Sequence, residues 1–260
     1  MKIAILYICT GKYSVFFPDF YASSERYFLP EAEKTYFVFS DDRSLADYPK
    51  VEFHYKECRG FPADSLFRFD AFLTVRDRIL EHDYAYFFNS NMLFVAPVGR
   101  EFLPTGDRLT AVPHAYLLRR WPCVLPYERN RKSRAYVPPY EGDYHYFMGG
   151  LNGGDSRAFV AFAEECSRRI HEDYDNGIVA VFHDESHLNR YMRDVGGEAL
   201  SPVYGYPEDS GLPLEAKILI RDKTKVDPYF RKDSKAYTLP QKFLKGCRMA
   251  WGVVRWYLKF

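Results

Sequence analysis

The chain has 260 residues, of which 47% are hydrophobic and 27% charged. This composition excludes a disordered or fibrous protein, and the length is enough for one large domain with a sizeable core. A formal net charge of +1 argues against a general nucleic-acid-binding role. Aromatic residues are abundant, with 22 Tyr and 22 Phe. They build cores and also stack on sugars and bases, so they point toward a sugar or nucleotide site without requiring one.

Basic residues concentrate at the C-terminal end of the chain. Residues 217–260 contain 12 Lys and Arg against 3 Asp, a net charge of +9, whereas residues 1–216 carry −8. We therefore expect the last sixth of the chain to have a role of its own.

The cysteines and the apolar runs indicate a cytoplasmic protein. Five cysteines occur without a CxxC motif or a Cys/His ligand spacing, which predicts reduced, mostly buried thiols. The apolar run 3–8 is too short for a signal peptide. No run approaches the roughly 18 apolar residues of a membrane span.

Hydrophobic periodicity predicts strands alternating with helices. The predicted strands are 3–8, 36–39, 84–88, 109–112, 144–148 and 217–220, and the predicted helices are 17–28, 64–81, 156–172 and 184–194. Residues 119–134 have no periodicity and are expected to form a long loop near the active face. The alternation predicts an α/β fold with a mostly parallel sheet, helices on both faces, and ligands at the carboxyl ends of the strands.

Two clusters follow predicted strands. Asn89 and Asn91 come directly after an apolar strand, where two amides suit a turn and a ligand-facing pair about equally. Residues 148–154 read Met-Gly-Gly-Leu-Asn-Gly-Gly and predict a loop whose backbone approaches a ligand closely, with a plain loop as the alternative. The spacing fits neither a dinucleotide fingerprint nor a P-loop.

A third cluster, residues 183–191, places several polar side chains at a helix start. Asp184 could be an N-cap and Glu185 an acid favoured by the helix dipole. The zinc pattern HExxH is absent, which disfavours metal ligation. A carboxylate beside a pocket can also act as a nucleophile or stabilise a glycosyl cation.

Together these segments resemble glycosyltransferase family 6, which includes the histo-blood-group A and B transferases and the α-1,3-galactosyltransferases. Residues 183–191 match the family's HDESHLNKY almost residue for residue, Tyr127-Glu128-Arg129 matches its YERR, and residues 141–144 match its EGDFYY. Matching segments begin at residues 7–13 and end at Leu200-Ser201-Pro202, so the resemblance covers roughly residues 1–222.

The resemblance implies a GT-A fold and the transfer of galactose or N-acetylgalactosamine (GalNAc) from UDP, with retention, to form α-1,3 links. Glu185 matches the family's catalytic carboxylate. Glu185 and His114 also match the positions that bind the acceptor in the family. The matching donor-binding positions are Tyr7, Ile8, Tyr13, Arg68, Asn89, Asn91, Met148, Gly149, Gly150, His183, Asp184, Lys223, Lys225 and Arg231.

Three departures from the family pattern change the expectations. Asn89-Ser90-Asn91 replaces the metal-binding Asp-Val-Asp, so we expect no divalent metal and no other cofactor. The chain begins at the catalytic domain, without the membrane-spanning segment and stem of vertebrate members; with the Asn-x-Asn pair this resembles the bacterial branch. Tyr206-Pro207 replaces the acceptor-side Trp-Asp, which leaves the acceptor open.

We interpret the chain as a catalytic domain (1–222), a basic tail closing over the UDP diphosphate (223–239) and an amphipathic helix (240–260). The helix carries one basic stripe, formed by Lys242, Lys245, Arg248, Arg255 and Lys259. This pattern predicts peripheral contact with anionic lipid on the inner face of the cell membrane. The alternative is a helix docked on its own domain or on a partner subunit.

The predicted activity is a metal-independent, retaining α-1,3-GalNAc transferase that acts on a galactoside, with or without a fucosyl branch. Gly150 matches the GalNAc-using A enzyme, whereas Met148 matches the galactose-using B enzyme. The alternatives are therefore a UDP-galactose-dependent transferase and a non-catalytic sugar- or nucleotide-binding module. The expected partners are a UDP-sugar and an oligosaccharide acceptor, and no nucleic acid.

Overall fold

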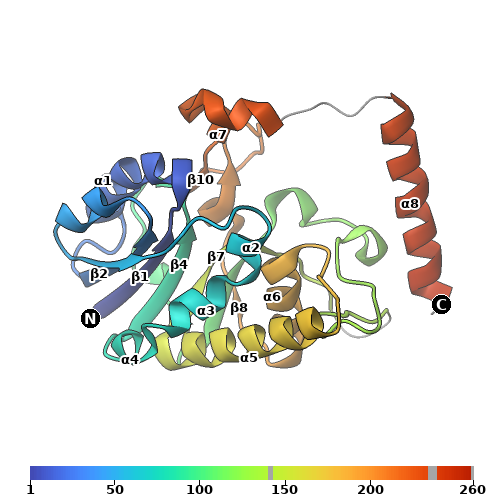
Figure 1. Ribbon diagram of the computed structural model, residues 1–260, viewed down its shortest axis with the longest axis horizontal. Helices are drawn as coiled ribbons and strands as arrows, with labels where there is room; N and C mark the ends of the chain where they lie inside the picture. The colour runs from blue at the N-terminus through green and yellow to red at the C-terminus, as the bar shows by residue number, and fades with distance from the viewer. Residues whose placement is uncertain (140–142, 234–238, 259–260) are drawn as a thin grey trace.

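The computed structural model describes residues 1–139, 143–233 and 239–258 and shows a mixed sheet covered by helices on both faces (Figure 1). Glu141 and Gly142 of the EGD segment lie outside the described residues. The main sheet has seven strands in the order β3-β2-β1-β4-β7-β6-β8. They are β1 Lys2–Ile8, β2 Glu33–Ser40, β3 Val51–Tyr55, β4 Tyr84–Asn89, β6 Leu109–Pro113, β7 Phe147–Asp155 and β8 Glu198–Ala199. A small second sheet holds β5 Met92–Phe94, β10 Ile218–Ile220 and β9 Tyr206–Pro207.

Alternation along β1 separates two apolar layers. Ile3, Ile5 and Tyr7 face a core shared with α1 (Phe17–Tyr27), whereas Ala4 and Leu6 face a core shared with α3 (Arg68–Leu73) and α5 (Ser156–Asp175). Strands β1 and β4 pair in parallel and their interiors are buried on both faces, which is why each is a nearly continuous apolar run. The edge strand β3 pairs in parallel with β2 and is only partly buried.

The glycine-rich segment after residue 148 is a strand, so the prediction of a loop there was wrong. β7 runs antiparallel between β4 and β6. A Cβ at Gly153 would lie 2.3 Å from the Ala85 carbonyl oxygen, and one at Gly154, where φ is +138°, would lie 2.2 Å from the Arg108 carbonyl oxygen. These two glycines serve close approach between neighbouring strands.

The predicted helix over residues 64–81 is broken into three short helices: α2 Ala63–Leu66, α3 and α4 Arg76–Ile79. Non-helical backbone angles at Phe67 and Val75 separate them. Helices α1, α5 and α6 (His183–Asp194) lie where the periodicity predicts them. The remaining helices are α7 Lys223–Val226 and the 3-10 helices η1 Gly11–Phe16, η2 Arg43–Asp47, η3 Arg100–Phe102, η4 Ala115–Leu117, η5 Pro122–Val124, η6 Pro202–Gly205 and η7 Pro228–Asp233.

The C-terminal helix α8 (Leu239–Leu258) stands beside the catalytic domain (Figure 1). It docks through Trp256, which is 4% exposed and donates a hydrogen bond from Nε1 to the Val137 carbonyl oxygen at 3.0 Å. One face of the helix therefore packs on its own domain, which was one of the two predicted alternatives. Across the described part of the chain, every helix is too short or too polar to cross a membrane.

The cysteines are all free thiols. Cys9 and Cys166 are buried, whereas Cys58 and Cys247 are exposed. The expectation that most of them are buried was therefore wrong, since neither Cys58 nor Cys247 belongs to a core-facing strand or helix position.

Candidate active site

The candidate site lies at one edge of the main sheet, where three strand ends meet. β1 ends at Ile8, which pairs with Asn89 at the end of β4. Because β7 runs antiparallel to β4, it begins at this same edge, with Met148 and Gly149 near its start. The first turn of α6 packs against the start of β7. The predicted positions Ile8, Asn89, Gly149 and Glu185 are thus brought together by the topology.

Both carboxylate oxygens of Glu185 are held by donors. The Tyr146 hydroxyl donates to Oε1 at 2.5 Å, and the Gly149 backbone N–H donates to Oε2 at 2.7 Å. Burial, and then the neighbouring Glu185 charge, raise the pKa of Tyr146 well above its ordinary value, so its hydroxyl remains a donor. A Cβ at Gly149 would lie 3.0 Å from the Glu185 Cβ. A side chain at this position would therefore crowd Glu185, and the glycine lets the carboxylate approach without a shift.

Hydrogen bonds from Asn189 link α6 to Phe147, the first residue of β7. Its Nδ2 donates to the carbonyl oxygens of Phe147 and Glu185, and its Oδ1 accepts from the Phe147 N–H, each at 2.8 Å. The sequence analysis gave no role to Asn189 or Tyr146. The spacing of four residues from Glu185 could have indicated Asn189, whereas Tyr146 becomes a partner only through the tertiary fold.

A buried ion pair lies beside Glu185. The Arg68 Nε is 3.2 Å from Asp184 Oδ2, and the Arg68 Nη1 donates to the Gly149 carbonyl oxygen at 3.3 Å. The guanidinium also lies 4.6 Å above the Phe87 ring. Burial raises the pKa of Asp184 to about 7, although Arg68 lowers it. The predicted donor-binding residues Arg68 and Asp184 are thus one unit.

His183 precedes this pair in an unusual backbone conformation. Its φ is +51°, in the left-handed region that non-glycine residues rarely adopt, and such strain clusters at functional sites. Its ring lies edge-on to Phe61 at 4.8 Å. Burial, followed by the Arg68 charge, lowers the pKa of His183. The imidazole is thus neutral near neutral pH.

The two asparagines form a hydrogen-bonded pair. Asn89 Nδ2 donates to Asn91 Oδ1 at 3.0 Å, and Asn91 Nδ2 donates to the Arg221 carbonyl oxygen at 2.8 Å. The Tyr7 hydroxyl supports the turn between them by donating to the Ser90 carbonyl oxygen at 2.6 Å. Tyr7 is fully buried and its ring stacks on Phe20, so the residue supports the site from the core and is not exposed to a nucleotide sugar.

This amide pair does not fit the divalent cation that the resemblance implies for the family. Such ions are held largely by carboxylate oxygens, and Asn91 already uses its oxygen within the pair. In the described parts of the chain, no three His, Cys, Asp or Glu side chains gather as a metal site.

The basic tail places its cations unequally. Lys223 donates from Nζ to the Tyr13 hydroxyl at 3.1 Å and lies 4.7 Å above the Tyr13 ring. Lys225 instead pairs with Asp209 and Glu208. The Arg231 Nε donates to the Thr224 carbonyl oxygen at 3.1 Å. The side chain of Lys232 lies outside the described residues.

Gly150 and His114 complete the predicted set. A Cβ at Gly150 would lie 3.4 Å from the Asn89 Cβ and 3.7 Å from the Met148 Cε, which is ordinary contact. The space beside Gly150 is therefore bounded by site residues. His114 follows β6, and its buried Nδ1 has no hydrogen-bond partner among the described residues. An acceptor hydroxyl is one partner that this nitrogen could take.

Asp184 should make stability depend on pH. Because its pKa in the folded state is raised from 3.8 to about 7, its contribution to stability is complete below pH 4 and is lost as the pH rises through 7. On acidification from pH 8 to pH 4, the wild type should therefore gain free energy of unfolding relative to Asp184→Asn, by on the order of 4 kcal/mol at most. Urea unfolding of both proteins at pH 4 and pH 8 measures this difference. A difference that is constant with pH would contradict the raised pKa.

Comparison with known proteins identifies the family. The sequence model of glycosyltransferase family 6 matches residues 1–228. The O-antigen biosynthesis glycosyltransferase WbnI of Escherichia coli is 35% identical over 231 residues, which cover 88% of this chain and 98% of that protein. The globoside alpha-1,3-N-acetylgalactosaminyltransferase 1 of Gallus gallus is 31% identical over 237 residues, covering 86% and 67%. The histo-blood group ABO system transferase 1 of Rattus norvegicus is 31% identical over 214 residues, covering 78% and 60%. The chain therefore belongs to glycosyltransferase family 6 and is a glycosyltransferase with a GT-A-like fold.

Proposed function

We propose that the protein transfers GalNAc from UDP-GalNAc to a galactoside, with or without a fucosyl branch, and forms an α-1,3 link with retention and without a divalent metal. The observation that carries this proposal is the Glu185 carboxylate, held on both oxygens at the strand edge where nucleotide-sugar sites lie in α/β sheets. The activities named for two relatives, an O-antigen transferase and a GalNAc transferase, support a sugar acceptor and this donor.

In the proposed reaction, the bond between the sugar C1 and the UDP oxygen breaks and UDP leaves with the electron pair. Positive charge then develops at C1, and Glu185 stabilises it from a fixed position. The donors Tyr146 and Gly149 orient the carboxylate without neutralising it. The acceptor hydroxyl forms the new bond to C1 on the face from which UDP departs, and its proton passes to the departing diphosphate oxygen on that face.

Replacing Glu185 by Gln should lower kcat by roughly 10²–10⁴, because about 3–5 kcal/mol of charge stabilisation is lost. UDP affinity, measured by calorimetry, should change little. Glu164→Gln is the matched control, since Glu164 is an exposed carboxylate paired with Arg76. Near-normal turnover of Glu185→Gln would reject the assignment. Slow UDP release by the wild type from UDP-GalNAc alone would separate an enzyme from a binding module.

Gly150 supports the choice of GalNAc over galactose. An acetamido group needs the volume that a β-carbon at this position would occupy, between Asn89 and Met148. The same contacts show that an alanine fits without a backbone clash, so the fold tolerates the change. Gly150 can therefore be tested for specificity separately from stability.

Gly150→Ala should reduce kcat/KM for UDP-GalNAc by roughly tenfold or more relative to UDP-galactose, because the methyl group competes with the acetamido group. Initial rates with both donors and one β-galactoside acceptor give this ratio. The UDP-galactose rate is the internal control for folding. A wild type that already prefers UDP-galactose would favour the alternative activity.

Positive side chains are proposed to replace the metal at the leaving group. UDP departs with negative charge, and ammonium or guanidinium groups can bind a diphosphate through charge-assisted hydrogen bonds. Arg68 lies within the site, and Lys223 lies over Tyr13, a predicted nucleotide contact. The asparagine pair would then bind the donor ribose or phosphate by hydrogen bonds.

Transferase activity should survive excess EDTA and gain little from added Mn²⁺. Lys223→Ala should reduce kcat by roughly 10-fold or more. Lys225→Ala should have a smaller effect, because Lys225 is already paired with Asp209 and Glu208. Activity that is lost in EDTA and restored by Mn²⁺ would contradict the metal-independent reaction.

A further inference from the structure

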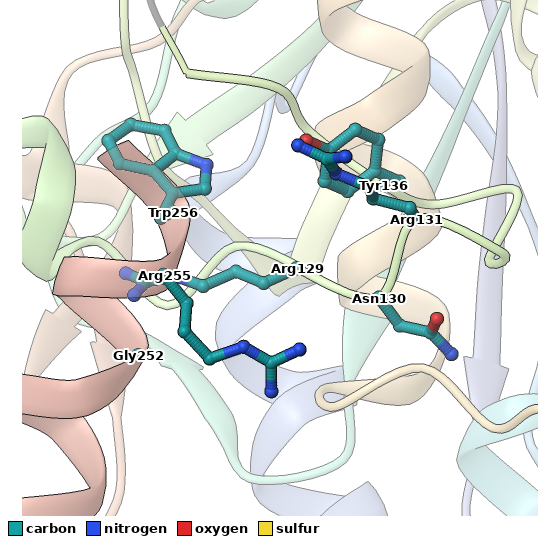
Figure 2. Close-up of a pocket in the computed structure, with 7 residues that line it drawn as sticks. All are labelled: Arg129, Asn130, Arg131, Tyr136, Gly252, Arg255 and Trp256. Carbon is teal, nitrogen blue, oxygen red and sulfur yellow. The ribbon is translucent and has the colours of Figure 1, made fainter. Parts of the chain in front are cut away.

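Three arginines from two distant parts of the chain meet at the junction of α8 with its domain. Arg129 and Arg131 come from the segment after η5, and Arg255 comes from α8. They line a hollow of about 310 Å³ that Tyr136 and Trp256 also bound. Figure 2 shows Arg129 and Arg255 reaching toward this hollow from the loop and from the helix. We call it the arginine pocket.

Among the residues that the structure describes, the arginine pocket has no carboxylate counter-charge. Within the described parts of the chain, no carboxylate lies within ion-pair distance of Arg129, Arg131 or Arg255. Glu128, next in sequence, is turned away and accepts from the N–H groups of Asn130 and Val181 at 2.6 and 2.7 Å. Three guanidinium groups without a counter-charge favour an anion, and their fork geometry suits phosphate oxygens.

Arg129 shows that the cationic pocket carries an electrostatic cost. Burial lowers the pKa of its guanidinium, which is held by the carbonyl oxygens of Cys123 and Leu125 and by the Trp256 ring, 5.5 Å away. A bound anion would offset this cost.

An exposed apolar stripe runs along α8 beside the pocket. Leu244, Trp251 and Leu258 are 52%, 62% and 58% exposed, and their spacing of seven residues places them on one face of the helix. Arg255 lies on the same face, four residues after Trp251. Trp121, 78% exposed, precedes the η5 segment against which α8 packs.

This combination matches the chemistry of a lipid–water interface. Exposed tryptophans sit at the headgroup level of bilayers, and basic residues attract anionic lipid. Residues 239–260 contain five Lys and Arg and no acid. The side chains of Lys242, Lys245, Arg248 and Lys259 lie outside the described residues, and the described basic side chain of this helix is Arg255.

We propose that the arginine pocket binds the phosphate of an anionic phospholipid headgroup while Trp251 and Leu258 enter the membrane interface. The helix face carrying Trp256 would remain docked on the domain, and the opposite face would meet the lipid. This inference goes beyond the proposed function, because it depends on neither the donor nor the acceptor sugar.

The test is flotation of the full chain with vesicles, in the absence of any sugar nucleotide. The protein should float with vesicles that contain phosphatidylglycerol and not with phosphatidylcholine alone. The double variant Arg131→Gln/Arg255→Gln should bind roughly 25-fold more weakly, at about fivefold per basic residue near the surface. Trp251→Ala should also weaken binding. Arg157→Gln, at the start of α5 and away from α8, removes one positive charge outside the pocket and should bind like the wild type.

A titration with inorganic phosphate decides between a lipid headgroup and a free anion as the source of the phosphate. Calorimetry with inorganic phosphate should show no binding at concentrations at which the vesicles are bound. Phosphate binding without vesicle binding would mean that the site takes a free anion and would overturn the lipid proposal. Equal flotation of the wild type and the double arginine variant, or equal flotation on neutral vesicles, would also overturn it. Retained activity on a soluble acceptor shows that the variants are folded. Vesicle binding is measured without any transfer reaction, so its outcome is independent of the proposed function.

Discussion

The close approach of α6 to β7 at Gly149 is the constraint on which the site depends. A Cβ there would lie 3.0 Å from the Glu185 Cβ and 3.2 Å from the Asp184 Oδ2, so the helix or the strand would have to shift by a few tenths of an ångström. With glycine in place, one backbone N–H orients the carboxylate and one carbonyl receives Arg68. Asn189 then fixes the same helix one turn later. A single missing Cβ thus positions an acid, a cation and the start of a central strand.

The electrostatics of the site follow from what surrounds Glu185. Asp184 is buried against Arg68 and titrates near neutrality, whereas the asparagine pair contributes hydrogen bonds and no charge. The site therefore combines one oriented carboxylate with a cation that is already partly compensated. That balance suits a developing sugar cation next to a departing diphosphate, which needs charge of both signs within a short distance.

Sequence patterns were sufficient to predict those helices and strands whose own residues show the periodicity or apolar run of that element. Helix α5 was predicted because its apolar residues repeat at helical spacing, and α6 because a polar helix start precedes it and two glycines follow it. Strands β1 and β4 were predicted because each is a short apolar run. The glycines of β7 read as a loop because their role is to admit the backbones of Ala85 and Arg108, which are remote in sequence. Tyr146 was missed for the same reason, since its partner Glu185 lies 39 residues away. Interactions that need the tertiary fold leave little trace in periodicity.

In the C-terminal helix, amino-acid composition does not reveal which side chains are buried against the domain and which are exposed. Trp251 and Trp256 belong to the same basic, aromatic segment, yet one is 62% exposed and the other 4% exposed. Five residues correspond to about 140° of helix rotation, so the two rings point to different sides. The sequence therefore predicted an amphipathic helix correctly without separating the side that docks from the side that is free. The buried ring reaches Tyr144 and Val137 in the aromatic cluster that continues through Tyr127 to Tyr146 and Glu185. A helix anchored in this way is linked to the active site through packed aromatic rings, so any surface that binds its free side also fixes the orientation of the site relative to that surface.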